Sequence, residues 1–135
     1  MSQLIASATL LVSDYDEAIG FFVDKLGFQL AHNLTRPGGG RWVEVRPNGG
    51  GAALRLALPA TPEQATLIGA QAGSRVLFVL HTDDLERDVA AYQAQGVIFQ
   101  EPARQEAYGA VAVFTDCCGN RWDLIQPAET ASAHT

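Results

Sequence analysis

The first folding unit of the chain opens with LIASATLLVSDYDEAIGFFVDKLGF, residues 4–28. Its apolar run, residues 4–12, alternates well enough to predict a β-strand. Asp14 then stands where a side chain can accept from the first amides of a helix, and Glu17 follows at capping-box spacing. Apolar residues recur beyond it at helical period, and Gly27 can supply the positive φ that ends a helix. This stretch therefore predicts a strand followed by a capped helix.

The same order of elements occurs twice along the chain. In the first copy the helix is followed by three extended segments, separated by Pro- and Gly-rich turns, at residues 28–34, 42–46 and 53–58. After a connector at residues 59–74, the second copy has a strand at 76–81, a helix capped by Asp83 or Asp84 and ended by Gly96, and extended segments at 97–100, 110–115 and 121–125. We therefore predict an α+β fold of two tandem βαβββ modules, about 4–58 and 75–127, in which each helix covers one sheet face.

Length and composition limit the functions that are open to the chain. Its 135 residues, 47% hydrophobic and 18% charged, predict one globular domain over residues 1–127 with a flexible tail at 128–135. The net charge of -6 without a Lys/Arg run argues against nucleic acid and against an anionic membrane surface. Neither a signal peptide nor a long apolar span is present, so we expect a cytoplasmic protein. The adjacent Cys117 and Cys118 are expected to be reduced thiols in a turn.

The second copy ends in FTDCCGNRWDL, residues 114–124. Together with the strand, helix and LGF pattern of residues 11–28, this ending resembles the vicinal-oxygen-chelate superfamily of glyoxalases, bleomycin resistance proteins and extradiol dioxygenases. The resemblance implies that the two modules form a cup-shaped mixed sheet, with helices outside and a small organic ligand inside. It also implies a homodimer.

The metalloenzymes of this superfamily hold one divalent ion with ligands from the first, fourth, fifth and eighth strands. The resemblance places these positions on Ser7, Arg55, Leu77 and Asp123, with Val76 in place of Leu77 if Asp83 is the helix cap. A neutral serine, a permanent cation and an apolar side chain are poor ligands, so we expect no metal and no other cofactor.

Two other uses of these positions stay open. Arg55 and Asp123 can form a bidentate ion pair at the centre of the cup, or Arg55 can reach solvent while Asp123 pairs with Arg121 or a backbone donor. The alternative to a metal-free site is Zn, Ni, Mn or Fe bound by a different set, such as His81, Asp123 and Glu44.

Strand alternation assigns residues to the ligand pocket. These residues are Ser7, Thr9, Leu11, Trp42, Glu44, Arg55, Leu77, Val79, His81, Arg121 and Asp123. We expect a small-molecule-binding protein of the bleomycin-resistance type. The alternative is an enzyme, either a lactoylglutathione-lyase-like lyase or isomerase or a dioxygenase-like protein. In a metal-free enzyme, Asp123 would act as base, and Arg55 or Tyr108 would stabilise an oxyanion.

Overall fold

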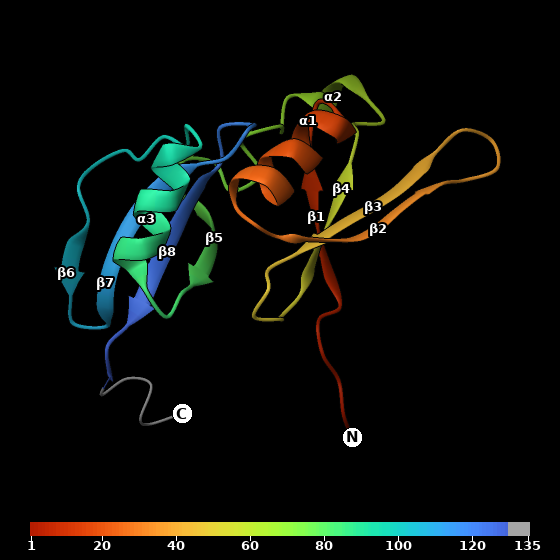
Figure 1. Ribbon diagram of the computed structural model, residues 1–135. Helices are drawn as coiled ribbons and strands as arrows, with labels where there is room; N and C mark the ends of the chain where they lie inside the picture. Colours follow the sequence, from red (N-terminus) through yellow and green to blue (C-terminus); the bar gives the residue numbers. More distant parts are fainter. Residues whose placement is uncertain (130–135) are drawn as a thin grey trace. The chain divides into compact units, whose positions relative to one another are not determined.

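The structure, a computed structural model, describes residues 1–129 of the chain. It divides into two compact units, residues 1–69 (unit 1) and the part from residue 70 onward (unit 2), and the boundary falls inside the expected connector. Each unit carries one four-stranded mixed sheet, so the prediction of an α+β fold with two βαβββ modules is confirmed (Figure 1). No described helix is long and apolar enough to cross a membrane. Residues 130–135 of the expected tail lie outside the described part.

Unit 1 has the strand order β1-β4-β3-β2, with β1 parallel to β4 and the other neighbours antiparallel. Its elements are β1 (Ser7–Leu11), α1 (Tyr15–Ile19), the π-helical segment η1 (Gly20–Lys25), β2 (Gln29–Thr35), β3 (Arg41–Arg46), β4 (Ala53–Ala57) and α2 (Pro62–Ala65). The expected strand at residues 4–12 is therefore shorter at its start. Residues 4 and 5 are exposed large apolar side chains outside the sheet.

The helix after β1 begins as the sequence indicates. The Asp14 carboxylate accepts from the Glu17 amide at 2.7 Å, which confirms the predicted cap, and Gly27 ends the helical segment at φ 77°. Its second half differs from the expected α-helix, because the Leu26 amide donates to the Phe21 carbonyl five residues back. The consecutive side chains Phe21 and Phe22 of this segment are both buried.

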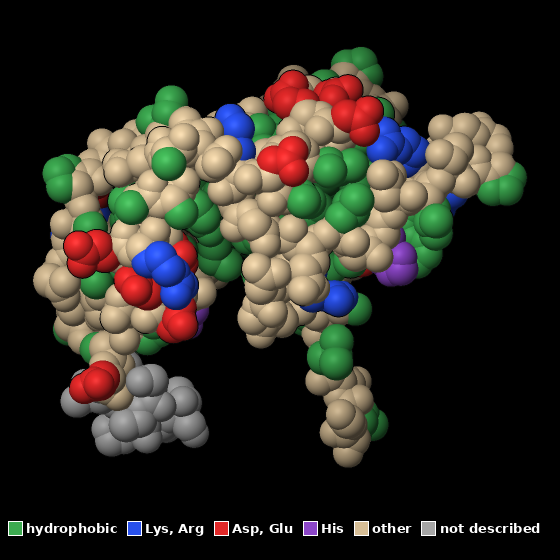
Figure 2. Space-filling view, viewed as in Figure 1, with side chains coloured by type: hydrophobic (Ala, Val, Ile, Leu, Met, Phe, Trp, Pro, Cys, Tyr) green, Lys and Arg blue, Asp and Glu red, His purple; other side chains and the backbone are tan. Residues whose placement is uncertain are grey.

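Asp and Glu side chains gather over α1 (Figure 2). One of them is neutralised, because Arg41 of β3 donates to the Asp16 carboxylate at 3.1 Å and to the Asn33 side chain at 2.9 Å. The Arg41 guanidinium also lies over the Tyr15 ring, 5.0 Å from its centroid. These contacts join the β2–β3 hairpin to the start of α1.

Unit 2 repeats the arrangement with the order β5-β8-β7-β6. Its elements are β5 (Val76–His81), α3 (Leu85–Ala94), β6 (Arg104–Glu106), β7 (Gly109–Thr115) and β8 (Arg121–Pro127). The helix cap left open by the sequence is Asp84, which accepts from the Arg87 amide at 3.0 Å, while Asp83 forms a salt bridge with the Arg87 side chain.

The prediction of a β-strand at residues 97–100 is wrong. This segment joins β7 through a single bridge, Phe99 to Phe114, and the strand that completes the sheet is β6. Pro102 lies between the two pairing points and has no amide proton to donate to a ladder, so pairing stops there and resumes two residues later.

Candidate functional site

The sheet of unit 1 has two different faces. One packs against α1 and η1 and is built from fully buried apolar residues such as Leu10, Val12, Val43 and Val45. Because side chains alternate along a strand, the intervening residues point to the opposite side. We call this second side the open face. Its residues on β1, β3 and β4 are exposed or half-buried except Ala53.

A polar row crosses the open face from strand to strand. Thr9 of β1 is the register partner of Arg55 of β4, Arg55 is the partner of Glu44 of β3, and Glu44 is the partner of His32 of β2. An apolar row lies beside it, with Leu11 paired to Ala57 on one side and Trp42 paired to Leu34 on the other. Four strands therefore contribute adjacent side chains to one surface.

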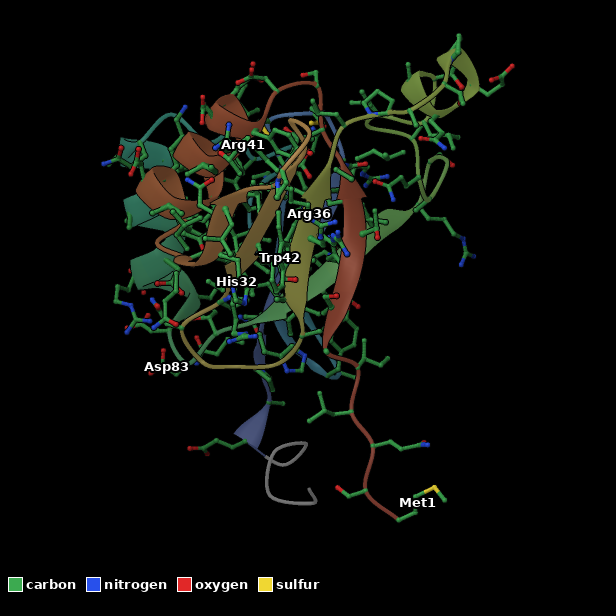
Figure 3. All side chains as sticks on the ribbon, turned by 90° about the vertical axis from the view of Figure 1, so that its right-hand side faces the viewer. Met1, His32, Arg36, Arg41, Trp42 and Asp83 are labelled. Carbon is green, nitrogen blue, oxygen red and sulfur yellow. The ribbon has the colours of Figure 1, made fainter. Side chains whose placement is uncertain are left out.

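Trp42 is the centre of the contacts on this face. Its indole Nε1 donates to the Glu44 carboxylate at 2.7 Å, and the His32 ring stacks on the indole with centroids 4.1 Å apart and planes 16° apart. The Arg36 guanidinium lies 6.0 Å from the centroid of the indole. Figure 3 shows His32, Arg36 and Trp42 together along the β2–β3 hairpin. Glu44 and His32 thus hold a large aromatic ring in a set orientation on a half-buried surface.

Two arginines flank this aromatic cluster. Arg46 follows Trp42 and Glu44 in alternation on β3, and its Nε is buried without a hydrogen-bond partner among the described residues. Arg55 is half-buried, and no salt bridge within unit 1 includes it. The open face therefore combines an aromatic surface with cationic hydrogen-bond donors.

Four of the residues expected in the pocket from the second module, Val79, His81, Arg121 and Asp123, lie on one face of the unit 2 sheet. Val79 is the register partner of Asp123, and His81 is the partner of Ile125. Arg121 donates to the Ser74 carbonyl at 3.2 Å, and no described salt bridge of unit 2 joins it to Asp123. Whether Asp123 pairs with Arg55 stays a prediction, because the two residues belong to separate units.

The register of β5 is irregular at its start. A bulge between Val76 and Phe78 makes Val76, and not Leu77, the partner of Arg121. Since Asp84 is the helix cap, the position seven residues before it is Leu77, which matches the spacing of Ser7 to Asp14.

Tyr108 lies at the edge of unit 2, where its side chain is 45% exposed. Its carbonyl accepts from the Ala128 amide, and its side chain is one of those that interact with Arg104. Arg104 also donates to Glu101 and Glu106, and chiefly the hydrogen bond with Glu106 raises its pKa. These contacts identify Tyr108 as part of a surface polar cluster.

The donor set at the family's metal positions does not fit a divalent ion. Ser7 is exposed, Arg55 brings a positive charge, and Leu77 has no donor atom, which leaves Asp123 as the only carboxylate of the four. Among residues 1–129, no group of three or more His, Cys, Asp or Glu side chains is placed to hold a metal ion.

Sequence reasoning missed His32, Arg36 and Arg46 of this cluster. A bulge in β2 between Leu30 and His32 breaks the alternation that would have assigned His32 to the open face. Arg46 could have been found, because it continues the alternation of Trp42 and Glu44.

The motif at residues 114–124 has a structural role in unit 2. Its buried Asp116 accepts from the Cys118 and Asn120 amides, from the Asn120 side chain, and from the Trp122 indole at 2.9 Å. This carboxylate thereby closes the β7–β8 turn. Cys117 and Cys118 lie in that turn with their Sγ atoms 3.9 Å apart.

Comparisons with known proteins agree with this architecture. The model of the Glyoxalase/Bleomycin resistance protein/Dioxygenase superfamily matches residues 4–124. A protein of Shewanella frigidimarina (strain NCIMB 400), described as uncharacterized, is 47% identical over 128 residues, which are 93% of this chain and 95% of that protein.

Two solved structures are also similar. UcmS2 has a TM-score of 0.79 at 28% identity and covers 93% of this chain and 98% of its own. TnmS3, an antibiotic binding protein from Streptomyces sp. CB03234, has a TM-score of 0.76 at 31% identity and covers 94% of this chain and 98% of its own. With its two βαβββ units and this match over residues 4–124, the chain belongs to the glyoxalase/bleomycin resistance protein/dioxygenase superfamily.

Proposed function

We propose that this protein binds a planar small organic molecule on the open face of unit 1 and does so without a divalent metal. The observation that carries the proposal is the orientation of Trp42, whose indole is held by Glu44 and stacked by His32 on a half-buried surface. A preoriented aromatic ring loses little entropy when a flat ligand stacks on it, so more of the contact energy is available for binding.

The relatives support a binding role. TnmS3 is an antibiotic binding protein, and it matches nearly the whole chain at 31% identity. Proteins with this fold carry different chemistries on one scaffold, so the argument for this chain must come from its own side chains. Those side chains are the aromatic and cationic groups of the open face.

The alternative is an enzyme, a lactoylglutathione-lyase-like lyase or isomerase or a dioxygenase-like protein. The metal-dependent form needs about three protein ligands for its ion, and Ser7, Arg55 and Leu77 supply none at the family positions. Stoichiometric Zn, Ni, Mn or Fe in purified protein would contradict our proposal. A metal-free enzyme with Asp123 as base predicts turnover that Asp123→Asn abolishes.

The binding proposal can be tested by calorimetric titration with 2-naphthamide, a neutral flat probe, in the presence of EDTA. We expect saturable binding that Trp42→Ala weakens by about tenfold, because it removes the ring on which the probe stacks. Tyr15→Ala is the matched control, since Tyr15 is also an aromatic residue beneath an arginine but is the first residue of α1. Equal affinities for the wild type and Trp42→Ala, or no saturable binding, would refute the proposal.

A further inference from the structure

We propose that the preferred ligand is a planar aromatic acid, whose ring lies on Trp42 and whose acidic group is bound by Arg46 and Arg55. This inference rests on the proposed function and specifies its ligand class. It depends on three observations in unit 1: an unsatisfied donor on one arginine, an arginine without a carboxylate partner, and the position of both beside the aromatic cluster.

Arg46 supplies the unsatisfied donor. Its Nε is buried and has no hydrogen-bond partner among the described residues. A guanidinium is always charged and presents donors in a planar fork, and a buried donor without a partner is costly. A ligand oxygen at this Nε would remove that cost on binding, so the position favours an acceptor.

Arg55 supplies the second positive charge. Its register neighbour Glu44 is the nearest carboxylate along the polar row, yet one oxygen of Glu44 accepts from the Trp42 indole, and no salt bridge joins Glu44 to Arg55. The bond to the indole directs one oxygen of Glu44 toward Trp42. Within unit 1, the Arg55 guanidinium has no salt bridge, so its positive charge is available to an anionic ligand.

The two arginines lie close enough to act on one group. Arg46 follows Glu44 by two residues on the same side of β3, so it is diagonal to Arg55 across the β3–β4 pair. Diagonal neighbours on one sheet face are within reach of long side chains. Trp42 precedes Glu44 by two residues on the same strand, so the indole lies on the same face of the sheet as the two arginines.

The chain as a whole is negatively charged, whereas the two arginines form a local positive charge. With a net charge of -6, the protein as a whole repels anions, so a preference for an acid must come from local cations. A carboxylate matches the guanidinium fork in two parallel hydrogen bonds, which a neutral amide cannot equal.

The test compares 2-naphthoate with 2-naphthamide, which share ring and shape but differ in charge. We expect the wild type to bind the acid at least about tenfold more tightly than the amide, because charge-assisted hydrogen bonds are about twice as strong as neutral ones. Arg55→Gln and Arg46→Gln should each reduce this ratio, because each variant removes a charge-assisted hydrogen bond that only the acid can form. Added salt should weaken the acid alone.

Arg41→Gln is the control, because Arg41 is on the helix side and is paired with Asp16. Equal affinity for acid and amide, both lost in Trp42→Ala, would overturn the acid preference and leave the proposed function intact. An acid preference that survives both Arg55→Gln and Arg46→Gln would also overturn it. If neither probe binds, both proposals fail.

Discussion

Replacing Asp116 with Asn should unfold the protein at lower denaturant, because the buried carboxylate receives its hydrogen bonds through both oxygens. Asp116 is 7% exposed, and its partners Asn120 and Trp122 are 3% and 2% exposed, so water cannot replace a lost acceptor. Oδ2 accepts from the Trp122 indole at 2.9 Å and from the Asn120 side chain at 3.0 Å. In the variant, an amide NH₂ on that side would face two N–H donors.

Each buried donor that loses its acceptor costs about 1–3 kcal/mol, and the two losses share one site, so we expect a decrease of about 2–4 kcal/mol in the free energy of unfolding. Urea unfolding followed by far-UV circular dichroism measures it. Asp83→Asn is the control, because Asp83 forms an exposed salt bridge whose loss should change the free energy of unfolding much less. A loss in Asp116→Asn no larger than in the control, at an unchanged m-value, would refute the structural role of this carboxylate.

Three other changes test the structure. Gly109→Ala should lower the free energy of unfolding by about 3 kcal/mol or more, because the glycine has φ 142° and an added Cβ would lie 2.2 Å from a backbone oxygen. Gly40→Ala is the control, because its added Cβ meets nothing within 4 Å and should leave the melting temperature unchanged. Burial raises the pKa of Tyr92 from 10.0 to about 12, so the tyrosine ionises at lower pH in the unfolded chain than in the folded one. The free energy of unfolding should therefore fall by about 2–3 kcal/mol as the pH rises from 10 to about 12. Tyr92→Phe should remove this contribution in urea titrations. If Asp123 pairs with Arg55, Asp123→Asn should lower the melting temperature by more than a surface change does, and an unchanged value would exclude the pair.

Local signals predicted much of the fold. Asp14 and Gly27 were identified as helix ends because a cap depends on a few neighbouring residues, and both act as expected. The segment at 97–100 was misassigned because its apolar residues are typical of a strand. Ile98 is exposed, whereas Phe99 lies near the Tyr92 ring of α3 and the Phe114 ring of β7.

The candidate site was only partly accessible from the sequence. Alternation correctly assigned Thr9, Trp42 and Arg55 to one face, because β1, β3 and β4 have regular registers. It could not assign His32, since a bulge depends on backbone pairing and has no marker in the sequence. Nor could it show that Glu44 binds the Trp42 indole, because that contact is set by side-chain rotamers and not by register.

The central claim is that a planar ligand binds on the open face of unit 1, and the indole N–H signals of the two tryptophans test it most directly. Trp42 lies on that face, whereas Trp122 is buried in unit 2 and donates to Asp116. In ¹⁵N-labelled protein titrated with 2-naphthoate, the Trp42 signal should shift in a saturable way while the Trp122 signal stays in place. A shift of the Trp122 signal alone, or no shift of the Trp42 signal at saturation, would contradict the account.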